Sequence, residues 1–206
     1  MSIVDARTSP SATSLVHEQL RALSALMDLK EVARAGWSEH QVPPLEVESV
    51  ADHSYGMALL ALTLPLPPAV DRNSLVALCL LHDLPEAITG DFTPTTAPVA
   101  KHQLERAAVE TQFAALRHAG ILDPSTKGFV TLLGRDDRTD PTVAWVHYLD
   151  RFELLLQAAR YVSTGRGVGM RDFARTPHGL EGTALAAMAD ALVEVIRAEA
   201  RTPSLP

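Results

Sequence analysis

Four side chains of metal-binding type stand out because each lies in an apolar stretch of the sequence. His82 and Asp83 are adjacent in "LCLLHDLPEAITGDFTP", His53 lies in "ESVADHSYGMALLAL", and Asp150 lies in "VAWVHYLDRFELLLQA". Burying such polar groups is costly unless they are paired or coordinate a metal. Two imidazoles and two carboxylates form a mixed nitrogen and oxygen ligand set that suits a borderline transition metal. The pattern therefore predicts a site for one divalent metal ion.

Each of these residues also has an ordinary structural explanation. A single histidine such as His53 is compatible with a satisfied core or surface position. Asp150 is compatible with an ion pair to Arg151 or Arg160, and His147 competes with His53 as the second histidine ligand. The residues taken one at a time leave these alternatives open.

Helices must position these side chains, because apolar residues recur at helical spacing along most of the chain and no segment shows a convincing strand pattern. We expect helices over residues 14–34, 49–64, 73–90, 99–119, 124–133, 141–162 and 180–200. Asp71 or Asn73 would cap the third of them, and Asp140 followed by Pro141 would open the sixth. Adjacent helical residues point about 100° apart, so the histidine–aspartate pair can share one ion only near the end of its helix.

The chain has 206 residues and no linker long enough to divide it. We expect one all-α domain over residues 1–206. Its parts would be a flexible N-terminus (1–12), a metal-site helical core (13–163), and a loop with a C-terminal helix (164–206). The alanine-rich last helix carries an apolar stripe of Leu185, Met188, Leu192 and Val195, which predicts a homodimer or a higher homo-oligomer.

Composition excludes several classes of protein. The net charge of −7 argues against a nucleic-acid surface. It is compatible with a phosphorylated small molecule, because a metal and a few arginines provide local positive potential. No apolar run reaches the ~18 residues of a membrane-spanning helix, and residues 1–12 lack the pattern of a signal peptide. The single cysteine, Cys79, rules out an intramolecular disulfide and predicts a reducing, cytoplasmic location.

The order His53…His82-Asp83…Asp150 resembles the H…HD…D signature of the HD superfamily of metal-dependent phosphohydrolases. The surrounding segments resemble its small 5′-deoxynucleotidase branch: "LKEVARAGW", "VESVADHSYGMALLAL", "LLHDLPEAITGDFTP" and "LDRFELLLQA". The similarity runs from about residue 29 to residue 159 and leaves the last ~45 residues without a match. One position departs from the pattern, because "SEHQV" has His40 near the place where members often carry an arginine.

The resemblance implies an HD-domain helical bundle in which these four residues hold one divalent ion: Co, Mn, Zn, Fe, Ni or Mg. It also implies a proton-transfer role for Glu86, which lies four residues after His82. The alternative for Glu86 is a carboxylate that supports the ligands or faces solvent. Asp91 would hold a sugar hydroxyl or the active-site loop, or would simply form a turn.

Three further residues are implied to bind the substrate. Arg34 would clamp the phosphate, because a guanidinium matches phosphate oxygens with two donors. Trp37 would pack against the deoxyribose and exclude a 2′-hydroxyl, or would be an ordinary core residue. Lys101 would add positive charge near the phosphate, or would lie on a solvated helix face.

The function that follows is removal of the 5′-phosphate from (deoxy)nucleoside monophosphates. One alternative is an HD hydrolase of another phosphate, such as a deoxynucleoside triphosphate or a specialised nucleotide-like metabolite. Arg166, Arg171 and Arg175 would then reach a longer phosphate chain, or would face solvent. A second alternative is a binding module that keeps the metal for stability. Residues of catalytic type beside the ligands argue against the second alternative, since structural metal sites are usually closed.

Overall fold

Helices make up the ordered framework of the chain. The computed structural model describes residues 12–91, 98–123, 139–166, 170, 174 and 178–199. Its α-helices are α1 (Ala12–Met27), α2 (Ala35–Glu39), α3 (Val50–Thr63), α4 (Arg72–Leu81), α5 (Glu86–Thr89), α6 (Pro98–His118), α8 (Pro141–Ser163) and α10 (Ala186–Glu199). Short 3-10 helices lie at Asp28–Glu31 (η1) and Pro44–Glu46 (η2). Within the described ranges the one extended pairing is an isolated bridge between Ala33 and Ser49, which confirms the predicted all-α class.

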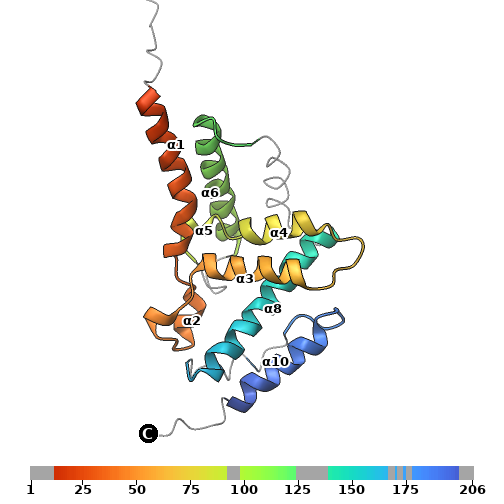
Figure 1. Ribbon diagram of the computed structural model, residues 1–206. Coiled ribbons are helices and arrows are strands. Elements are labelled where there is room, and N and C mark those ends of the chain that lie inside the picture. Colours follow the sequence, from red (N-terminus) through yellow and green to blue (C-terminus); the bar gives the residue numbers. More distant parts are fainter. Residues whose placement is uncertain are drawn as a thin grey trace, which may run out of the picture.

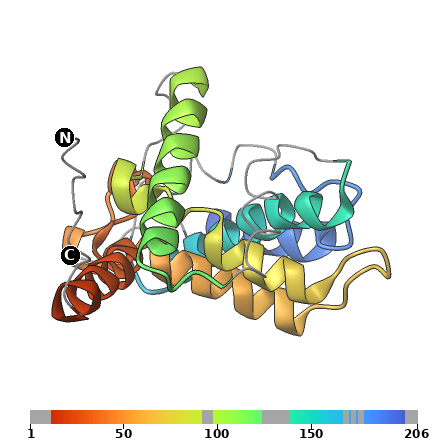
Figure 2. The same cartoon turned by 90° about the horizontal axis from the view of Figure 1, so that it is seen from above.

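The helices form a central layer with a smaller pair at one end. In Figure 1, α3 and α4 lie side by side as an antiparallel hairpin, α8 crosses them, and α10 packs along α8. Side chains from these helices and from the loop around α2 share the main hydrophobic cluster. Helices α1 and α6 pack against each other, and Figure 2 shows α6 projecting away from the central layer. None of the helices in the described ranges is both long and apolar enough to cross a membrane.

Three of the helices begin at side-chain caps that fix their start points. Ser49 and Asp52 form a capping box at α3, in which each side chain accepts the other residue's backbone N–H at 2.9–3.1 Å. Asp71 caps α4, so of the two candidates the aspartate is correct. Asp140 accepts backbone N–H groups of α8, whose first residue is Pro141, as predicted. These caps fix where α3 and α8 begin, and so where the predicted metal ligands His53 and Asp150 lie on them.

The prediction of one continuous helix over residues 73–90 is wrong. Helix α4 ends at Leu81, residues 82–85 form a turn, and a separate short helix, α5, follows. Pro85 explains part of this break, because proline has no N–H to donate and its ring clashes with the carbonyl four residues earlier. Gly90, with a φ of 74°, ends α5. His82 and Asp83 therefore lie just beyond the end of α4.

Three other boundaries differ from the sequence-based prediction. The first helix, predicted for residues 14–34, ends at Met27 and is followed by the 3-10 helix η1. Residues 34–48, predicted to be a loop, contain the short helices α2 and η2. The last helix begins at Ala186, since residues 181–185 form turns and Gly182 has a φ of 77°. The helix predicted for residues 124–133 lies outside the described residues, as does nearly all of the N-terminal segment predicted to be flexible.

Candidate metal centre

The four predicted ligands come together from three parts of the fold. His53, in the first turn of α3, is fully buried, and its Nε2 lies 3.2 Å from Asp150 Oδ1 of α8 and 3.9 Å from Asp83 Oδ2. His82 Nε2 lies 3.1 Å from the same Asp83 oxygen. One ligand atom from each of His53, His82 and Asp83 falls within a group less than 4.8 Å across, and Asp150 adjoins it through His53. Among the described residues, no such group includes His147.

Both imidazoles have their outer nitrogen held by an acceptor. His82 Nδ1 lies 2.9 Å from the carbonyl oxygen of Cys79, and His53 Nδ1 lies 2.5 Å from Glu153 Oε2. Because a carbonyl or a carboxylate oxygen can only accept, each Nδ1 carries the proton. Neither Nε2 atom has a hydrogen-bond partner of acceptable geometry, although both are buried. Two nitrogens directed at carboxylate oxygens in this way fit a bound cation, and metal-binding histidines are typically held by the other nitrogen as here.

The charges around the ligands favour a cation in the same place. Burial alone would lower the pKa of His53, but the Asp150 and Glu153 carboxylates outweigh it and raise that pKa to about 10. Burial would raise the pKa of Asp83, yet the neighbouring His82 outweighs it and the pKa is lowered; Asp150 also has a lowered pKa, chiefly through His53. The site thus stabilises positive charge at the His53 ring, and a metal ion would take the place of a proton on Nε2.

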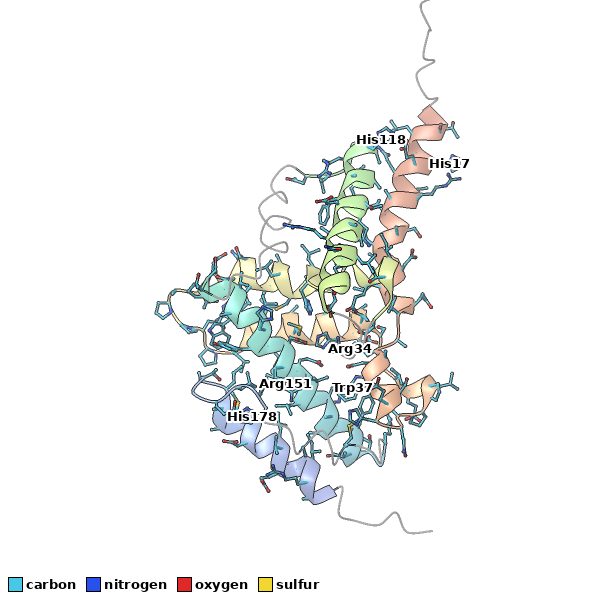
Figure 3. The ribbon with its side chains drawn as sticks, turned by 180° about the vertical axis from the view of Figure 1, so that it is seen from behind. His17, Arg34, Trp37, His118, Arg151 and His178 are labelled. Atoms are coloured by element: carbon cyan, nitrogen blue, oxygen red, sulfur yellow. The ribbon has the colours of Figure 1, made fainter. Side chains whose placement is uncertain are left out.

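Arg34 lies beside the ligands. Its Nη1 is 3.4 Å from Asp83 Oδ2, and its side chain is 14% exposed. Burial lowers the pKa of this guanidinium, but Asp83, Asp150, Asp91 and Glu86 together raise it above its usual value. In Figure 3, Arg34 lies near the middle of the molecule, far from His17 and His118 on the α1–α6 pair. One arginine among four acids is a strongly negative site, so it would accept a phosphate only together with a metal cation.

The main chain around Arg34 is fixed at two points. Its N–H donates to the carbonyl of Glu48 at 3.1 Å, next to the bridge between Ala33 and Ser49. The N–H of the next residue, Ala35, donates to Asp91 Oδ2 at 2.8 Å. Asp91 therefore holds the loop that carries Arg34, which is one of the roles that the sequence left open for it.

Glu86 is buried at the start of α5, with the residue only 4% exposed. Its charge acts on Arg34, so it belongs to the same electrostatic group as the ligands. This position fits a carboxylate that works inside the site, and it excludes the solvent-facing alternative.

The structure places Trp37 in the core. The residue is 1% exposed, and its Nε1–H donates to Glu48 Oε1 at 2.8 Å. Its ring packs in a T-shaped arrangement with the Tyr161 ring, with the two ring centroids 5.2 Å apart. An indole buried in this way has almost no surface for a sugar, so the predicted contact with deoxyribose is not present in this conformation. The core alternative is the one observed.

The remaining predicted substrate residues are less informative. Lys101 lies in α6, but its side chain is outside the described part of the structure. Arg166 forms an ion pair with Glu46 at 2.5 Å and is more than 40% exposed. Arg171 and Arg175 also fall outside the described residues.

One buried and one half-buried acid at the site, Glu153 and Glu48, escaped the sequence-based prediction. Glu153 contacts His53, and Glu48 accepts the Trp37 N–H. Burial, and then the nearby Glu153 charge, raise the pKa of Glu48 to about 7. A signal for Glu153 existed, because it follows Asp150 by three residues and so shares its helical face. Glu48 lies in a loop, where no periodicity marks it.

Comparisons with known proteins agree with this geometry. The family model described as "HD domain" matches residues 26–174. The 5′-deoxynucleotidase HDDC2 of Danio rerio is 31% identical over 146 residues, covering 69% of this chain and 68% of that protein. The protein of the same name from Xenopus laevis is 32% identical over 176 residues, 82% of each chain. The solved structure of PH0347 protein from Pyrococcus horikoshii OT3 superposes with a TM-score of 0.65 at 24% identity, covering 86% of this chain and 98% of that one.

Proposed function

Because this chain belongs to the HD domain family, we propose that it is a metal-dependent phosphohydrolase that removes the 5′-phosphate from (deoxy)nucleoside monophosphates. The relatives named 5′-deoxynucleotidase support the substrate class, since they match over about two thirds or more of their length. The buried arrangement of metal-type residues beside an arginine supports the reaction class.

His53, His82, Asp83 and Asp150 would hold one divalent ion. When bound, such an ion supplies Lewis acidity that polarises a phosphate oxygen and lowers the pKa of a water molecule. The mixed imidazole and carboxylate set favours a transition metal over a metal that prefers oxygen alone. The two buried Nε2 atoms without hydrogen-bond partners are the observation that carries this assignment.

The other residues have roles set by their positions. Arg34, 3.4 Å from Asp83, would orient the phosphate with its two donors. Glu86 would transfer a proton to or from the reacting oxygen, and Asp91 would keep the Arg34 loop in place through the Ala35 N–H. The chain therefore supplies orientation through Arg34 and a proton path through Glu86.

The direct test is to incubate metal-loaded protein with dAMP, AMP and dATP and to measure orthophosphate, pyrophosphate and triphosphate separately. We expect orthophosphate from dAMP, a lower kcat/KM for AMP, and loss of activity in a chelator with recovery on adding Co²⁺ or Mn²⁺. A His82→Ala preparation purified in parallel controls for contaminating phosphatases. Triphosphate release from dATP as the main reaction would assign the other class of HD hydrolase, and no release from any nucleotide would reject the proposal.

A further inference from the structure

A buried carboxylate contacts His53 on the side of the ring away from the other ligands. Glu153 Oε2 lies 2.5 Å from His53 Nδ1, and Asp150 Oδ1 lies 3.2 Å from Nε2 of the same ring. Both acids belong to α8 and are three residues apart, so one helical face meets both nitrogens. The His53 side chain is fully buried and that of Glu153 is 9% exposed. Solvent therefore competes little for this contact.

We propose that Glu153 is a positioning residue, which fixes the tautomer and the ring plane of His53 so that Nε2 presents its lone pair to the metal. This inference rests on the proposed metal centre. A carboxylate that accepts the Nδ1 proton leaves Nε2 without one, and it also makes the imidazole a stronger ligand. Loss of such a partner would leave His53 in its pocket but free to change tautomer or to tilt.

Gly56 provides the space that this contact needs. It lies on α3 one turn after His53, and a Cβ built at this position would lie 2.9 Å from Glu153 Oε1 and 3.2 Å from Cγ. The φ of Gly56 is not positive, so the backbone conformation does not require glycine here. What requires it is the close approach of the Glu153 side chain, and any larger residue would push the carboxylate away from His53.

The same residues do not suit a second metal ion. Glu48, His53 and Glu153 each offer an atom within a group less than 4.8 Å across. The nitrogen that His53 would contribute to such a site is Nδ1, which already lies at hydrogen-bond distance from Glu153. One nitrogen cannot donate a proton and bind a metal at the same time. Glu48 instead accepts the Trp37 N–H at 2.8 Å, which extends the supporting network into the core.

The test compares Co²⁺ binding in the full-length protein and in Glu153→Ala, Glu153→Gln and Gly56→Ala. Phe152→Leu is the control, since it alters a buried residue of α8 next to Glu153 without removing the contact to His53. Affinity is measured by competition with a chelator, and ligand geometry by the visible absorption spectrum of bound Co²⁺. We expect Glu153→Ala to weaken binding by about 10- to 100-fold and to alter the spectrum.

The other variants have their own expected effects on Co²⁺ affinity. Glu153→Gln should lose less affinity than Glu153→Ala, because an amide oxygen can still accept the Nδ1 proton. Gly56→Ala should weaken binding with Glu153 still present, and Phe152→Leu should lower the melting temperature while keeping affinity and spectrum near wild type. If Glu153→Ala does not fold, Glu153→Gln and Gly56→Ala decide the question.

The outcomes separate this inference from the metal centre itself. Wild-type affinity and spectrum in the Glu153 and Gly56 variants would overturn the positioning role and leave the metal centre intact. An equal loss of affinity in Phe152→Leu would assign the effect to packing and would also overturn it. Failure of the wild-type protein to bind Co²⁺ would overturn both.

Discussion

The two imidazoles at the centre differ in how their outer nitrogens are held. His82 Nδ1 faces the main-chain carbonyl of Cys79, whereas His53 Nδ1 faces the Glu153 side chain. A main-chain acceptor is kept whatever side chain occupies position 79, but the acceptor of His53 depends on one residue. At the residue scale, His53 is thus the ligand whose orientation a single substitution can disturb.

Removing a ligand should abolish metal binding. In His82→Ala or Asp83→Ala, we expect loss of bound metal and of turnover, because the remaining side chains cannot complete the coordination shell. The helices should survive, since both residues lie in the turn after α4 and neither belongs to the main hydrophobic cluster. Metal content by elemental analysis and circular dichroism measure the two effects. Full metal occupancy with normal turnover in Asp83→Ala would reject the site.

Substituting the buried acid of α5 should affect chemistry and not metal content. Glu86→Gln keeps the size of the side chain but cannot take up a proton, so we expect kcat for dAMP to fall by about 10²–10⁴-fold. Steady-state kinetics on a preparation of known metal content gives the value. A change below about threefold would mean that Glu86 only supports the surrounding structure.

Glu48 should make stability depend on pH. Its pKa is about 7 in the folded protein and 4.5 in the reference state, so the folded form binds the extra proton between these values. The contribution of Glu48 to the free energy of unfolding is therefore largest below pH 4.5 and is lost as pH rises through about 7. The loss is on the order of 1–3 kcal/mol.

The Glu48→Gln variant tests the direction of this pH dependence. The amide cannot ionise but can still accept the Trp37 N–H. The variant should therefore be more stable than the wild-type protein at pH 8, and its advantage in the free energy of unfolding should be smaller at pH 5. Urea unfolding of chelator-treated protein at both pH values gives the comparison. A wild-type advantage that grows with pH would contradict the expectation.

At the element scale, the end of α4 resolves a difficulty in the sequence. Two adjacent residues inside a helix diverge by about 100°, yet His82 Nε2 and Asp83 Oδ2 lie 3.1 Å apart. His82 keeps helical φ and ψ (−61° and −36°) and donates its N–H to the Leu78 carbonyl as the cap of α4. The chain after it turns, with Leu84 and Glu86 donating to residues three positions earlier, so Asp83 does not continue the helix. Short breaks of this kind allow neighbouring side chains to converge on one point.

Asp91 links two elements, and its role can be tested by separating charge from hydrogen bonding. In Asp91→Ala, the Ala35 N–H at the start of α2 loses its acceptor, so Arg34 should be held less firmly and KM for dAMP should rise more than kcat falls. Asp91→Asn retains an oxygen acceptor and should restore most of KM. Equal damage in both variants would indicate that the carboxylate charge itself acts on the substrate.

Most of the helices and the caps at Asp71 and Asp140 were predictable, because periodicity and capping residues are local properties. The break between Leu81 and Glu86 was not, since apolar residues continue at helical spacing through it and Pro85 alone does not fix where a helix ends. The ligand set was predictable in type, whereas the contact of Glu153 with His53 depends on how α3 and α8 cross. Trp37 remained ambiguous for the same reason: a loop tryptophan beside an arginine suits a sugar or a core equally well.

At the scale of the whole molecule, several helices expose apolar side chains. The exposed apolar residues of α1 are Leu15, Val16, Leu20, Leu23 and Met27, those of α3 are Tyr55, Leu59 and Leu62, and those of α10 are Met188 and Val195. The stripe predicted on the last helix is therefore partly wrong, because Leu185 is buried in the molecule's own core and Leu192 is half-buried.

The cytoplasmic location also stays a prediction. Burial raises the pKa of the Cys79 thiol to about 12, and a thiol so protected is unreactive in any compartment.

Self-association through an exposed face remains our expectation for the whole molecule. Light scattering across a range of concentrations should give at least twice the monomer mass. A Met188→Lys/Val195→Lys double variant and a Leu20→Lys/Leu23→Lys double variant identify which helix is involved, since a charge in the contact would favour the monomer. A monomer at every concentration of the wild-type protein would reject the expectation.

The second hydrophobic cluster has a consequence for how the site responds to heat. This cluster joins α1 and α6 through Ala22, Phe113 and Leu116 and includes Leu84, whose carbonyl accepts the Gln112 amide at 3.1 Å. A group of helices with its own small core opens locally at lower free energy than the whole molecule. When α1 and α6 open, the segment from Leu81 to Glu86 loses its packing, and with it His82 and Asp83, while α3 and α8 still hold His53 and Asp150. Warming would therefore release the ion and stop turnover before the whole molecule unfolds, and activity would return on cooling only if metal is present in solution.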